Sequence, residues 1–468
     1  MLDVIVVGAG TAGLAAVREV AKRTDNFLLV NDGPYGTTCA RVGCMPSKVL
    51  IEAANAFHRR HDFAEFGIAG AEALRMDVAA ALRRVRRLRD DFVRGTLKAT
   101  DRLGAKSIPG RARLVAPDTV EVDGVRHRAR AVVLATGSSP FVPAPMRAFG
   151  ERVFTTDDLF ERTDLPPRLA VLGLGPIGAE IAQAVARLGI AVYAFERQEQ
   201  VCGLTDPAVN AALVEALGGE MTLHLGATAE LADGPGGLVV SAGEARIEVD
   251  GVLVALGRRP NVADLGLECL GVPLDDAGMP AVDPETQQIG DLPVFVAGDA
   301  NGKRAILHEA ADEGHIAGLN AIAPTVRRFP RRIPLGVVFV APNVATLGER
   351  FADLDPAATA VGEVSFARQG RARTAQTNAG VLRVYAAKAD GRLLGAELCA
   401  PAGEHLAHLL ALAVERRLTV AELLRLPFYH PVLEEGLRTA LRAVSRELPR
   451  CGDSDLAGCD AFGVEALD

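Results

Sequence analysis

The sequence predicts an α/β protein with two Rossmann-like dinucleotide-binding domains and a C-terminal α+β domain. Two segments, residues 4–31 and 169–196, each consist of an apolar run, a turn spaced G-x-G-x-x-G, a helical stretch and a second apolar run. This is the order of a β-α-β unit that binds a dinucleotide. From about Ile333 the pattern changes to strands and amphipathic helices without Gly-rich phosphate loops, which indicates a separate domain.

Composition argues against several other classes of protein. The 468 residues carry a net charge of −8, contain no Trp and are only 4% aromatic, which disfavours a nucleic-acid-binding surface. There is no run of about twenty apolar residues to span a membrane, and the N-terminal MLDVIVVGAG lacks the basic leader of a signal peptide. We therefore expect a cytoplasmic protein. In that reducing compartment, a closely spaced pair among its seven cysteines is more often catalytic than structural.

The glycines of the two turns should let each unit hold a pyrophosphate. They are Gly8, Gly10 and Gly13 in the first turn and Gly173, Gly175 and Gly178 in the second. A Cβ at Gly10 or Gly175 would keep the pyrophosphate away from the helix N-terminus, whose N–H groups and positive dipole end stabilise its charge. The alternative is a turn that merely packs helix on strand. The complete strand–turn–helix–strand context, present twice, disfavours it.

Glu196 ends the second β-α-β unit, at the position where a ribose-binding side chain belongs. A carboxylate there accepts hydrogen bonds from both ribose hydroxyls and repels a 2′-phosphate. The sequence therefore favours NAD(H) over NADP(H), although the neighbouring Arg197 could meet a phosphate instead.

The stretch GTTCARVGCMPSKVL (36–50) contains two cysteines, Cys39 and Cys44, separated by four residues. Pro46 suggests an early helical position, which places Cys44 near a helix N-terminus, where the dipole favours a thiolate. Cys39, one turn away, is better placed to attack an incoming disulfide. This division suits thiol–disulfide exchange coupled to hydride transfer. Two structural cysteines or half of a zinc site are the alternatives, but no second Cys/His pair with suitable spacing lies nearby.

The order of these motifs resembles that of the pyridine nucleotide-disulfide oxidoreductases, in particular their dihydrolipoamide dehydrogenase branch. The resemblance extends to about residue 445 and depends on these stretches: GAGTAG (8–13), GTTCARVGCMPSK (36–48), ATGSSP (135–140), GLGPIGAE (173–180), ALGRRPN (255–261), AGDAN (297–301) and YHPVLEE (429–435). It implies FAD and NAD as cofactors, a redox-active disulfide between Cys39 and Cys44, and a homodimer with shared active sites.

The resemblance also assigns roles to single residues. Lys48 and Glu180 would form an ion pair near the flavin N5, and Asp299 would bind the ribityl chain of FAD. His430 and Glu435 resemble the family's acid–base dyad, which would reach the cysteines of the other subunit and move protons to the exchange thiol. The other cofactor-binding residues that it implies are Gly8, Gly10, Gly13, Asn31, Thr38, Thr136, Gly137, Gly173, Gly175, Gly178, Glu196 and Gly257.

Two residues depart from the family's pattern. Asn31 stands where the family usually has Glu, at the adenosine ribose of FAD, and a neutral amide should bind the hydroxyls more weakly. Asp32 could substitute for it. Arg41 stands where the family often has Asn, between the two thiols in sequence. We hypothesise that Arg41 stabilises the thiolate or attracts an anionic substrate.

The domains that we predict are an FAD-binding domain (1–143), an NAD-binding domain (144–264), a central segment completing the FAD domain (265–334), a dimerisation domain (335–447) and a flexible C-terminal tail (448–468). The tail contains Cys451 and Cys459, whose long spacing matches no relay motif. Cys202, Cys269 and Cys399 are most simply small buried residues.

Three functions remain open on the sequence. The first is dihydrolipoyl dehydrogenase, which oxidises the dithiol of a lipoylated carrier protein with NAD⁺. The second is a reductase of the same family that acts on another small disulfide, mercuric ion or a quinone. A mercuric reductase would be expected to lack His430 and to carry adjacent C-terminal cysteines. The third is a non-catalytic flavin-binding protein, which the cysteine pair and the dyad disfavour.

Overall fold

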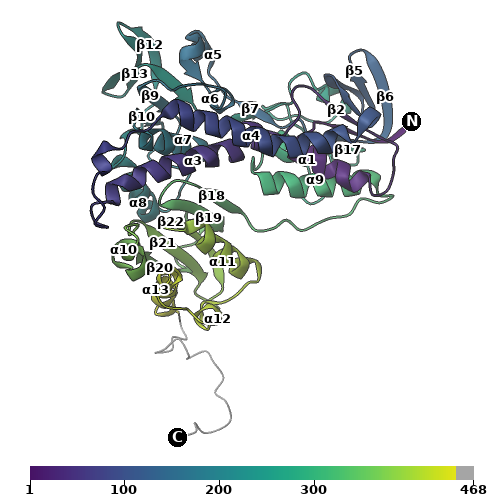
Figure 1. Cartoon of the computed structure of the whole chain (residues 1–468). Coiled ribbons are helices and arrows are strands. Elements are labelled where there is room, and N and C mark those ends of the chain that lie inside the picture. The colour runs from purple at the N-terminus through teal and green to yellow at the C-terminus, as the bar shows by residue number, and fades with distance from the viewer. Residues whose placement is uncertain (449–468) are drawn as a thin grey trace, which may run out of the picture. The chain divides into compact units, whose positions relative to one another are not determined.

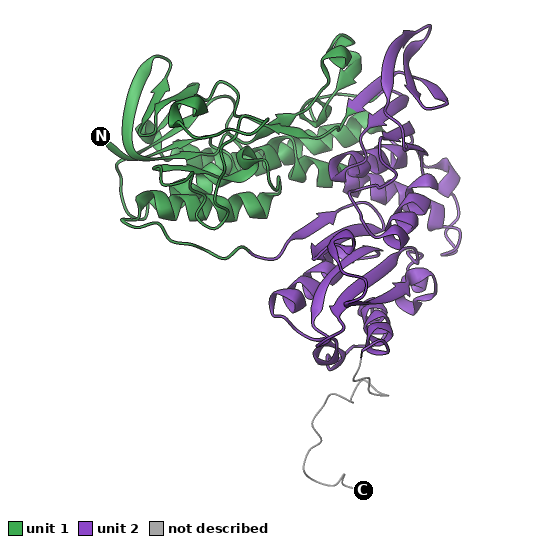
Figure 2. Ribbon diagram, turned by 180° about the vertical axis from the view of Figure 1, so that it is seen from behind, with its two compact units in different colours: residues 1–50, 77–165, 254–331 green, residues 51–76, 166–253, 332–468 purple. Residues whose placement is uncertain are grey.

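Residues 1–448 are described by a computed structural model (Figure 1). Their contacts divide the chain into two units (Figure 2). Unit 1 contains residues 1–50, 77–165 and 254–331, and unit 2 contains residues 51–76, 166–253 and the described part of 332–468. Each unit is therefore assembled from segments that are far apart in the sequence. Within the described residues, no helix combines the length and apolar character needed to cross a bilayer.

The core of unit 1 is a parallel sheet in the order β3-β2-β1-β6-β17. Its strands are β1 (Leu2–Val7), β2 (Phe27–Asn31), β3 (Ser107–Pro109), β6 (Val125–Leu134) and β17 (Val294–Val296). An antiparallel ribbon, β4 (Ala112–Ala116) and β5 (Thr119–Val122), continues from β6. The central strands are continuous apolar runs because both faces of the sheet are covered, and Val4–Val7 are at most 5% exposed.

Two helices pack unusually closely on one face of this sheet. They are α1 (Thr11–Val20) and α9 (Leu307–Ile322). A Cβ on Gly314 would lie 2.1 Å from the backbone oxygen of Ala12, and one on Gly318 would lie 2.6 Å from that of Ala16. Only glycine at these two positions of α9 permits this approach. The helix that follows the first Gly-rich turn is thereby fixed against a helix almost 300 residues later in sequence.

Unit 2 contains a second sheet that includes the strands β11, β10, β9 and β15 in that order, and the pairs β11–β10 and β10–β9 are parallel. The elements of this fold are β9 (Arg168–Leu172), α7 (Pro176–Arg187), β10 (Ala191–Glu196), α8 (Pro207–Gly218), β11 (Thr222–Leu225) and β15 (Gly251–Val254). An antiparallel meander of β12 (Glu230–Gly234), β13 (Gly237–Ala242) and β14 (Ala245–Val249) precedes β15.

The C-terminal part of unit 2 is an antiparallel sheet in the order β18-β19-β22-β21-β20. Its strands are β18 (Leu335–Val338), β19 (Asn343–Gly348), β20 (Thr359–Ser365), β21 (Val381–Ala387) and β22 (Leu393–Ala400). The helices α11 (Gly403–Glu415), α12 (Val420–Leu424) and α13 (Glu434–Ser445) contribute to its apolar core. The predicted fold class, two Rossmann-like folds and a C-terminal α+β domain, is confirmed.

The remaining helices and strands connect these parts. They are α2 (Thr38–Arg41), α3 (Cys44–His58), α4 (Val78–Asp101), β7 (Ser138–Pro140), α5 (Ala144–Arg147), β8 (Val153–Phe154), α6 (Thr156–Leu159), β16 (Arg258–Pro260) and α10 (Gly370–Thr374), with the 3-10 helices η1 (Arg59–Asp62), η2 (Ala71–Ala73), η3 (Gly104–Lys106), η4 (Gly150–Arg152), η5 (Leu267–Leu270), η6 (Gly298–Asn301), η7 (Phe351–Asp353) and η8 (Phe366–Arg368). The predicted domain boundaries stay predictions. The tail with Cys451 and Cys459 lies outside the described residues.

Candidate active site

The first Gly-rich turn joins β1 to α1. Gly8 has φ +106°, and a Cβ on it would lie 2.2 Å from the backbone oxygen of Ala135. A Cβ on Gly13 would lie 1.8 Å from the backbone oxygen of Gly8, so these two glycines are required by the packing of the turn itself. At Gly10 a Cβ would meet nothing within 4 Å. Gly10 is the N-cap of α1 and supplies no side-chain cap, so the first N–H groups of the helix face open space that suits an anion.

The second turn has the same construction. Gly173 has φ +91°, and Gly175 is the N-cap of α7 without a side-chain cap. A Cβ on Gly175 would also meet nothing within 4 Å, whereas Gly178 is buried in the helix. Both units therefore offer an uncapped helix N-terminus to a pyrophosphate.

A polar side chain at the end of each second strand contacts the Gly-rich turn. Asn31, the last residue of β2, accepts a hydrogen bond on Oδ1 from the backbone N–H of Ala9 at 2.9 Å. Glu196, the last residue of β10, accepts one on Oε2 from the backbone N–H of Leu174 at 2.7 Å. The neighbouring Arg197 is exposed. This places both side chains beside their turns, where a ribose would lie.

Asp299 lies in η6 and belongs to a chain of hydrogen bonds that the sequence did not indicate. Its Oδ2 accepts a hydrogen bond from Oγ of Ser138 at 2.7 Å, and Ser138 in turn accepts one from Nε of Arg258 at 2.8 Å. Arg258 also donates to the backbone oxygen of Ser138 at 2.6 Å. Ser138 and Arg258 belong to the antiparallel pair β7 and β16, which therefore orients the carboxylate of Asp299.

Residues next to this strand pair provide a second indication of a ligand. The Oγ1 of Thr136 is buried and has no hydrogen-bond partner in the described part of the chain, which is unusual for a buried hydroxyl. Gly137 has φ +71° and its backbone oxygen accepts a hydrogen bond from the N–H of Asn261 at 2.9 Å. Gly257 has φ +101° and its oxygen accepts one from Phe141 at 2.9 Å. The orphaned hydroxyl and the open helix end fit a bound dinucleotide.

The two cysteines lie in two successive helices, the four-residue α2 and the 15-residue α3. Cys39 is the second residue of α2, a helix that the sequence did not predict, and Cys44 is the first residue of α3. Thr37 has φ +58° and caps α2 by accepting a hydrogen bond from the N–H of Ala40. Thr38, the first residue of α2, is exposed. Cys44 is thus at a helix N-terminus, as its position before Pro46 indicates.

The thiol of Cys39 is hydrogen-bonded to Cys44, so the two thiols are neighbours in the structure. This hydrogen bond, together with burial, raises the pKa of Cys39 well above its ordinary value. This shift favours the protonated form of Cys39. Cys44 is exposed, whereas Cys39 is half-buried.

Lys48, Arg41 and Glu180 complete the set of residues predicted near the cysteines. Nζ of Lys48 lies 3.5 Å from Oγ of Ser47. The aliphatic part of Arg41 packs over Gly36, since a Cβ there would lie 3.1 Å from Cδ of Arg41. Glu180 is buried in unit 2. The Lys48–Glu180 ion pair and the role of Arg41 stay predictions.

The backbone segment that binds the side chain of Glu180 could not be predicted from the sequence. Its Oε1 accepts a hydrogen bond from the N–H of Phe339 at 2.8 Å, across 159 residues. One turn later on α7, Gln183 pairs with the backbone of Ala341 through both its Oε1 and its Nε2 at 2.8 Å. The segment 339–341 therefore lies along α7 and orients Glu180.

The predicted dyad is formed at the start of α13. Nδ1 of His430 lies 3.0 and 3.1 Å from Oε1 and Oε2 of Glu435. This contact, and a hydrogen bond from the N–H of Val432, lower the pKa of Glu435. The side chain of His430 is 80% exposed, so its Nε2 is accessible to a reacting group. A His held in this way by a carboxylate is suited to general acid–base work.

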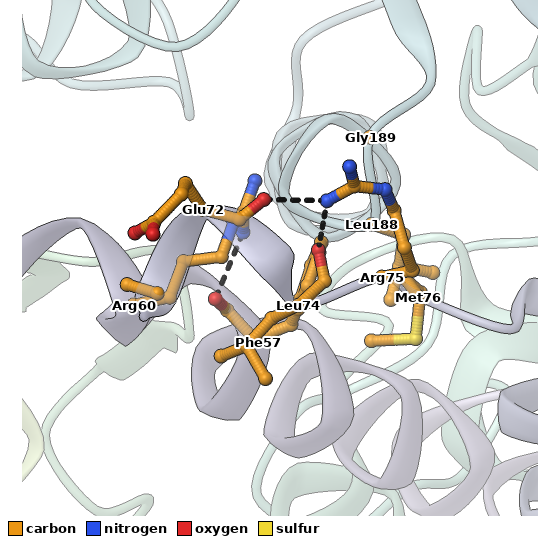
Figure 3. Close-up of a pocket in the computed structure, with 9 residues that line it drawn as sticks. Phe57, Arg60, Glu72, Leu74, Arg75, Met76, Leu188 and Gly189 are labelled. Carbon is orange, nitrogen blue, oxygen red and sulfur yellow. Dashed lines mark hydrogen bonds between the residues drawn. The ribbon is translucent and has the colours of Figure 1, made fainter. Parts of the chain in front are cut away.

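A separate pocket of about 370 Å³ lies in unit 2 (Figure 3). Arg60 and Arg75 enter it, but each donates to nearby backbone oxygens: Arg60 to Phe57, and Arg75 to Glu72 and Leu74. None of the predicted site residues lines it. The pocket is therefore not part of the candidate site.

Two family models match the chain. The model described as pyridine nucleotide-disulphide oxidoreductase matches residues 2–314, and the dimerisation domain of the same family matches residues 334–441. The chain belongs to the pyridine nucleotide-disulphide oxidoreductase family. Enzymes of this family use FAD and NAD(H), and their dimerisation domain agrees with the expected homodimer.

Curated relatives of this family member have two different names. The chain is 32% identical to a dihydrolipoyl dehydrogenase of Thermus scotoductus, over 95% of this chain and 98% of the relative. It is 30% identical to a dihydrolipoyl dehydrogenase of Trypanosoma brucei brucei, over 94% and 96% of the two chains. It is also 30% identical to a mercuric reductase of Acidithiobacillus ferrooxidans, over 96% and 83%. Identity alone therefore does not select the substrate.

Solved structures support the fold. The HOCl-induced flavoprotein disulfide reductase RclA of Escherichia coli, as its Cu(II) complex, has a TM-score of 0.82 at 21% identity and covers 95% of this chain and 99% of its own. LpdA of Mycobacterium tuberculosis also has a TM-score of 0.82, at 24% identity, over 94% and 99% of the two chains. At these identities the likeness shows the fold alone.

Proposed function

We propose that this family member is a dihydrolipoyl dehydrogenase, which oxidises the dithiol of a lipoylated carrier protein to a disulfide and reduces NAD⁺ to NADH. In the balanced reaction the two thiols lose two electrons and two protons. The nicotinamide gains a hydride, and one proton is released. The observation that carries the proposal is the His430–Glu435 contact at 3.0 Å, because thiol oxidation needs a base for the departing protons and reduction of mercuric ion does not require one.

The chain's own residues account for the exchange half of the reaction. When the pair is oxidised, a substrate thiolate attacks Sγ of Cys39, the S–S bond breaks and Cys44 leaves as thiolate. His430 of one protomer takes the proton of the substrate thiol at its partner's cysteine pair. The second substrate thiolate then attacks the mixed disulfide, and Cys39 leaves and is protonated. Its raised pKa favours that protonated product.

Bound FAD supplies the two-electron connection between the cysteine pair and the nicotinamide. We propose that Gly8, Gly10, Gly13 and Asn31 hold its adenosine diphosphate part and that Asp299 binds its ribityl chain. The open N-terminus of α1 and the orphaned hydroxyl of Thr136 support this assignment.

The corresponding site of the second unit would hold NAD(H). We assign its pyrophosphate to the turn of Gly173, Gly175 and Gly178 and its adenosine ribose to Glu196. Glu180, with Lys48, is proposed to lie at the hydride-transfer face.

The experiment that tests the function is a steady-state assay of the purified homodimer with NADH or NADPH against lipoamide, glutathione disulfide and mercuric ion. We expect turnover with lipoamide and NADH. Activity with mercuric ion or glutathione disulfide and none with lipoamide would reject the proposal. The alternative, mercuric reductase, is favoured by one observation, the 30% identity to enzymes of that name.

A further inference from the structure

Glu313 is a buried carboxylate that binds the turn carrying Asp299. It lies in the middle of α9 and is only 6% exposed. Its Oε2 accepts two hydrogen bonds of 2.8 Å, one from the backbone N–H of Gly298 and one from Nδ2 of Asn301. Gly298 and Asn301 are the first and last residues of η6. One carboxylate oxygen therefore fixes both ends of the turn in which Asp299 lies.

This turn and α9 both pack closely against Ala12 of α1. A Cβ on Gly298, whose φ is +74°, would lie 2.9 Å from the Cβ of Ala12. A Cβ on Gly314, the residue after Glu313, would lie 2.1 Å from the backbone oxygen of Ala12. Ala12 is in the first turn of α1, next to the open helix end at Gly10. Glu313 therefore belongs to the same closely packed corner as the pyrophosphate turn.

An ionised carboxylate at this buried position is energetically unfavourable. Burial raises the pKa of Glu313 to about 7, although the N–H of Gly298 and the charge of Arg331 act in the opposite direction. Nη2 of Arg331 lies 3.5 Å from Oε1 of Glu313. Glu309, one turn earlier on α9, also acts on Glu313 and raises its pKa. A buried ionisable group with a shifted pKa beside a ligand turn is a common feature of functional sites.

The other charged groups around Glu313 form ion pairs or hydrogen bonds with other residues. Glu309 is paired with Arg304 at 3.0 Å and with Arg331. On α1, Glu19 is paired with Lys22 and, at 2.8 Å, with His315 of α9. The part of α1 nearest to Glu313 presents Ala12, and β17 is apolar. Asp299, in the bound turn, is hydrogen-bonded to Ser138.

We propose that Glu313 is a positioning residue for flavin binding, whose ionised carboxylate fixes the Gly298–Asn301 turn so that Asp299 and Ser138 meet the cofactor in the correct orientation. The inference deepens the proposed function, since it takes FAD as the ligand of this turn. The neutral form of Glu313 keeps acceptor capacity, but each hydrogen bond to it is weaker than one to a carboxylate.

The test compares Glu313→Gln with the matched control Glu309→Gln. The control removes one charge from the same helix, one turn away, and leaves the two hydrogen bonds between Glu313 and the turn in place. Because Glu309 raises the pKa of Glu313, the control should move the pH dependence to lower pH without removing it. Apo-protein is titrated with FAD between about pH 6 and about pH 8.5, and the dissociation constant is read from flavin fluorescence. For the wild type we expect binding to become ~10-fold tighter as the pH rises. Glu313→Gln should bind FAD ~10-fold more weakly than the wild type at the upper pH and lose the pH dependence.

A second readout separates positioning from stability. Glu313→Gln should raise the melting temperature of the apo-protein at about pH 8.5, since it removes a costly buried charge. Weaker FAD binding by a more stable protein cannot come from general destabilisation. Asn301→Ala removes the hydrogen bond that the turn donates to Glu313 from the side chain of Asn301, and it should weaken FAD binding as well.

Three results would overturn the inference. In the first, Glu313→Gln binds FAD like the wild type with the same pH dependence. In the second, Glu309→Gln behaves like Glu313→Gln, which would assign the effect to charge in general. In the third, Asn301→Ala leaves FAD binding unchanged. Failure of the wild type to bind FAD at any pH would instead reject the proposed function itself, and with it this inference.

Discussion

Asn31 and Glu196 make the same contact with the middle residue of their Gly-rich turns. Oδ1 of Asn31 accepts from Ala9 at 2.9 Å, and Oε2 of Glu196 accepts from Leu174 at 2.7 Å. The rest of each side chain is used differently. Nδ2 of Asn31 donates to the backbone oxygen of Gly33 at 2.9 Å, whereas Oε1 of Glu196 accepts from the N–H of Gln198 at 3.2 Å. The first turn is thus contacted by an amide side chain where the second is contacted by a carboxylate.

Asn31→Glu should therefore tighten FAD binding. A charged acceptor forms stronger hydrogen bonds with the ribose hydroxyls than a neutral amide, and we expect a roughly 10-fold lower dissociation constant. Titration of apo-protein with FAD measures it. The KM for NADH, which depends on the second unit, is the internal control and should not change. An unchanged or weaker FAD affinity with an unchanged KM would mean that Asn31 does not limit binding.

Glu196→Gln should shift the cofactor preference toward NADPH. The carboxylate of Glu196 repels a 2′-phosphate, whereas the exposed Arg197 can attract one. Once Glu196 is neutralised, only the attraction by Arg197 remains. The ratio of kcat/KM for NADPH to that for NADH is expected to rise roughly 10-fold. The matched control is Glu199→Gln, which removes a nearby exposed charge and should leave this ratio at the wild-type value.

His430→Gln should lower kcat with lipoamide by about 100-fold or more, because it removes the proposed proton acceptor of the exchange. Glu435→Gln keeps the base but removes the charge that orients it, and a smaller loss, roughly 10-fold, is expected. Neither variant should change the FAD content. Glu434→Gln, at the neighbouring position of α13, is the control with near wild-type turnover. Full activity of His430→Gln would reject the assigned role.

Tyr385→Phe should destabilise unit 2 without affecting catalysis. The hydroxyl of Tyr385 donates to Oδ2 of Asp206 at 2.9 Å, and both side chains are completely buried. Asp206 also caps α8 and receives two 2.9 Å hydrogen bonds from Nη1 of Arg383. Loss of the hydroxyl leaves one acceptor site of a buried carboxylate unfilled, at a cost of about 1–3 kcal/mol. Denaturant unfolding measures this cost, and an unchanged midpoint would contradict it.

The Gly-rich turns could be predicted from the sequence because their contacts are local. Gly8, Gly10 and Gly13 lie within one strand–turn–helix segment, and the spacing of glycines alone predicts the open helix end. The contacts that hold the Asp299 turn in place could not be predicted in this way. Glu313 looks like a polar residue of an amphipathic helix, and only the packing of α9 on α1 directs it at the Asp299 turn.

Contacts between residues that lie far apart in the sequence leave still less trace in it. The N–H of Phe339 binds Glu180 across 159 residues, and Ser138 binds Asp299 across 161. A backbone donor can come from any residue except proline, so no residue type marks Phe339 as a partner. Ser138 and Arg258 lie in stretches that resemble family motifs, but their hydrogen bond to each other follows from strand pairing rather than from spacing.

The contribution of Glu313 to the stability of the apo-protein should fall as the pH rises toward and through neutrality. The folded protein holds the pKa of Glu313 at about 7, above the ordinary value of 4.5 for a free glutamate, because burial disfavours the charge. The protonated form is therefore the one that the fold favours. Its stabilisation is complete below about pH 4.5 and is lost progressively as the pH rises through about 7.

For a shift of this size the loss approaches about 3 kcal/mol, since one pKa unit corresponds to about 1.4 kcal/mol. Glu313→Gln carries no charge at any pH, so this part of the pH dependence should disappear. Urea unfolding of apo-protein at about pH 5 and about pH 8.5 measures the difference. The variant should match the wild type at the lower pH and exceed its stability at the higher one. A wild-type protein whose Glu313 contribution does not change between these two conditions would show that the carboxylate is already ionised at the lower pH, and that the surrounding N–H groups and Arg331 outweigh its burial.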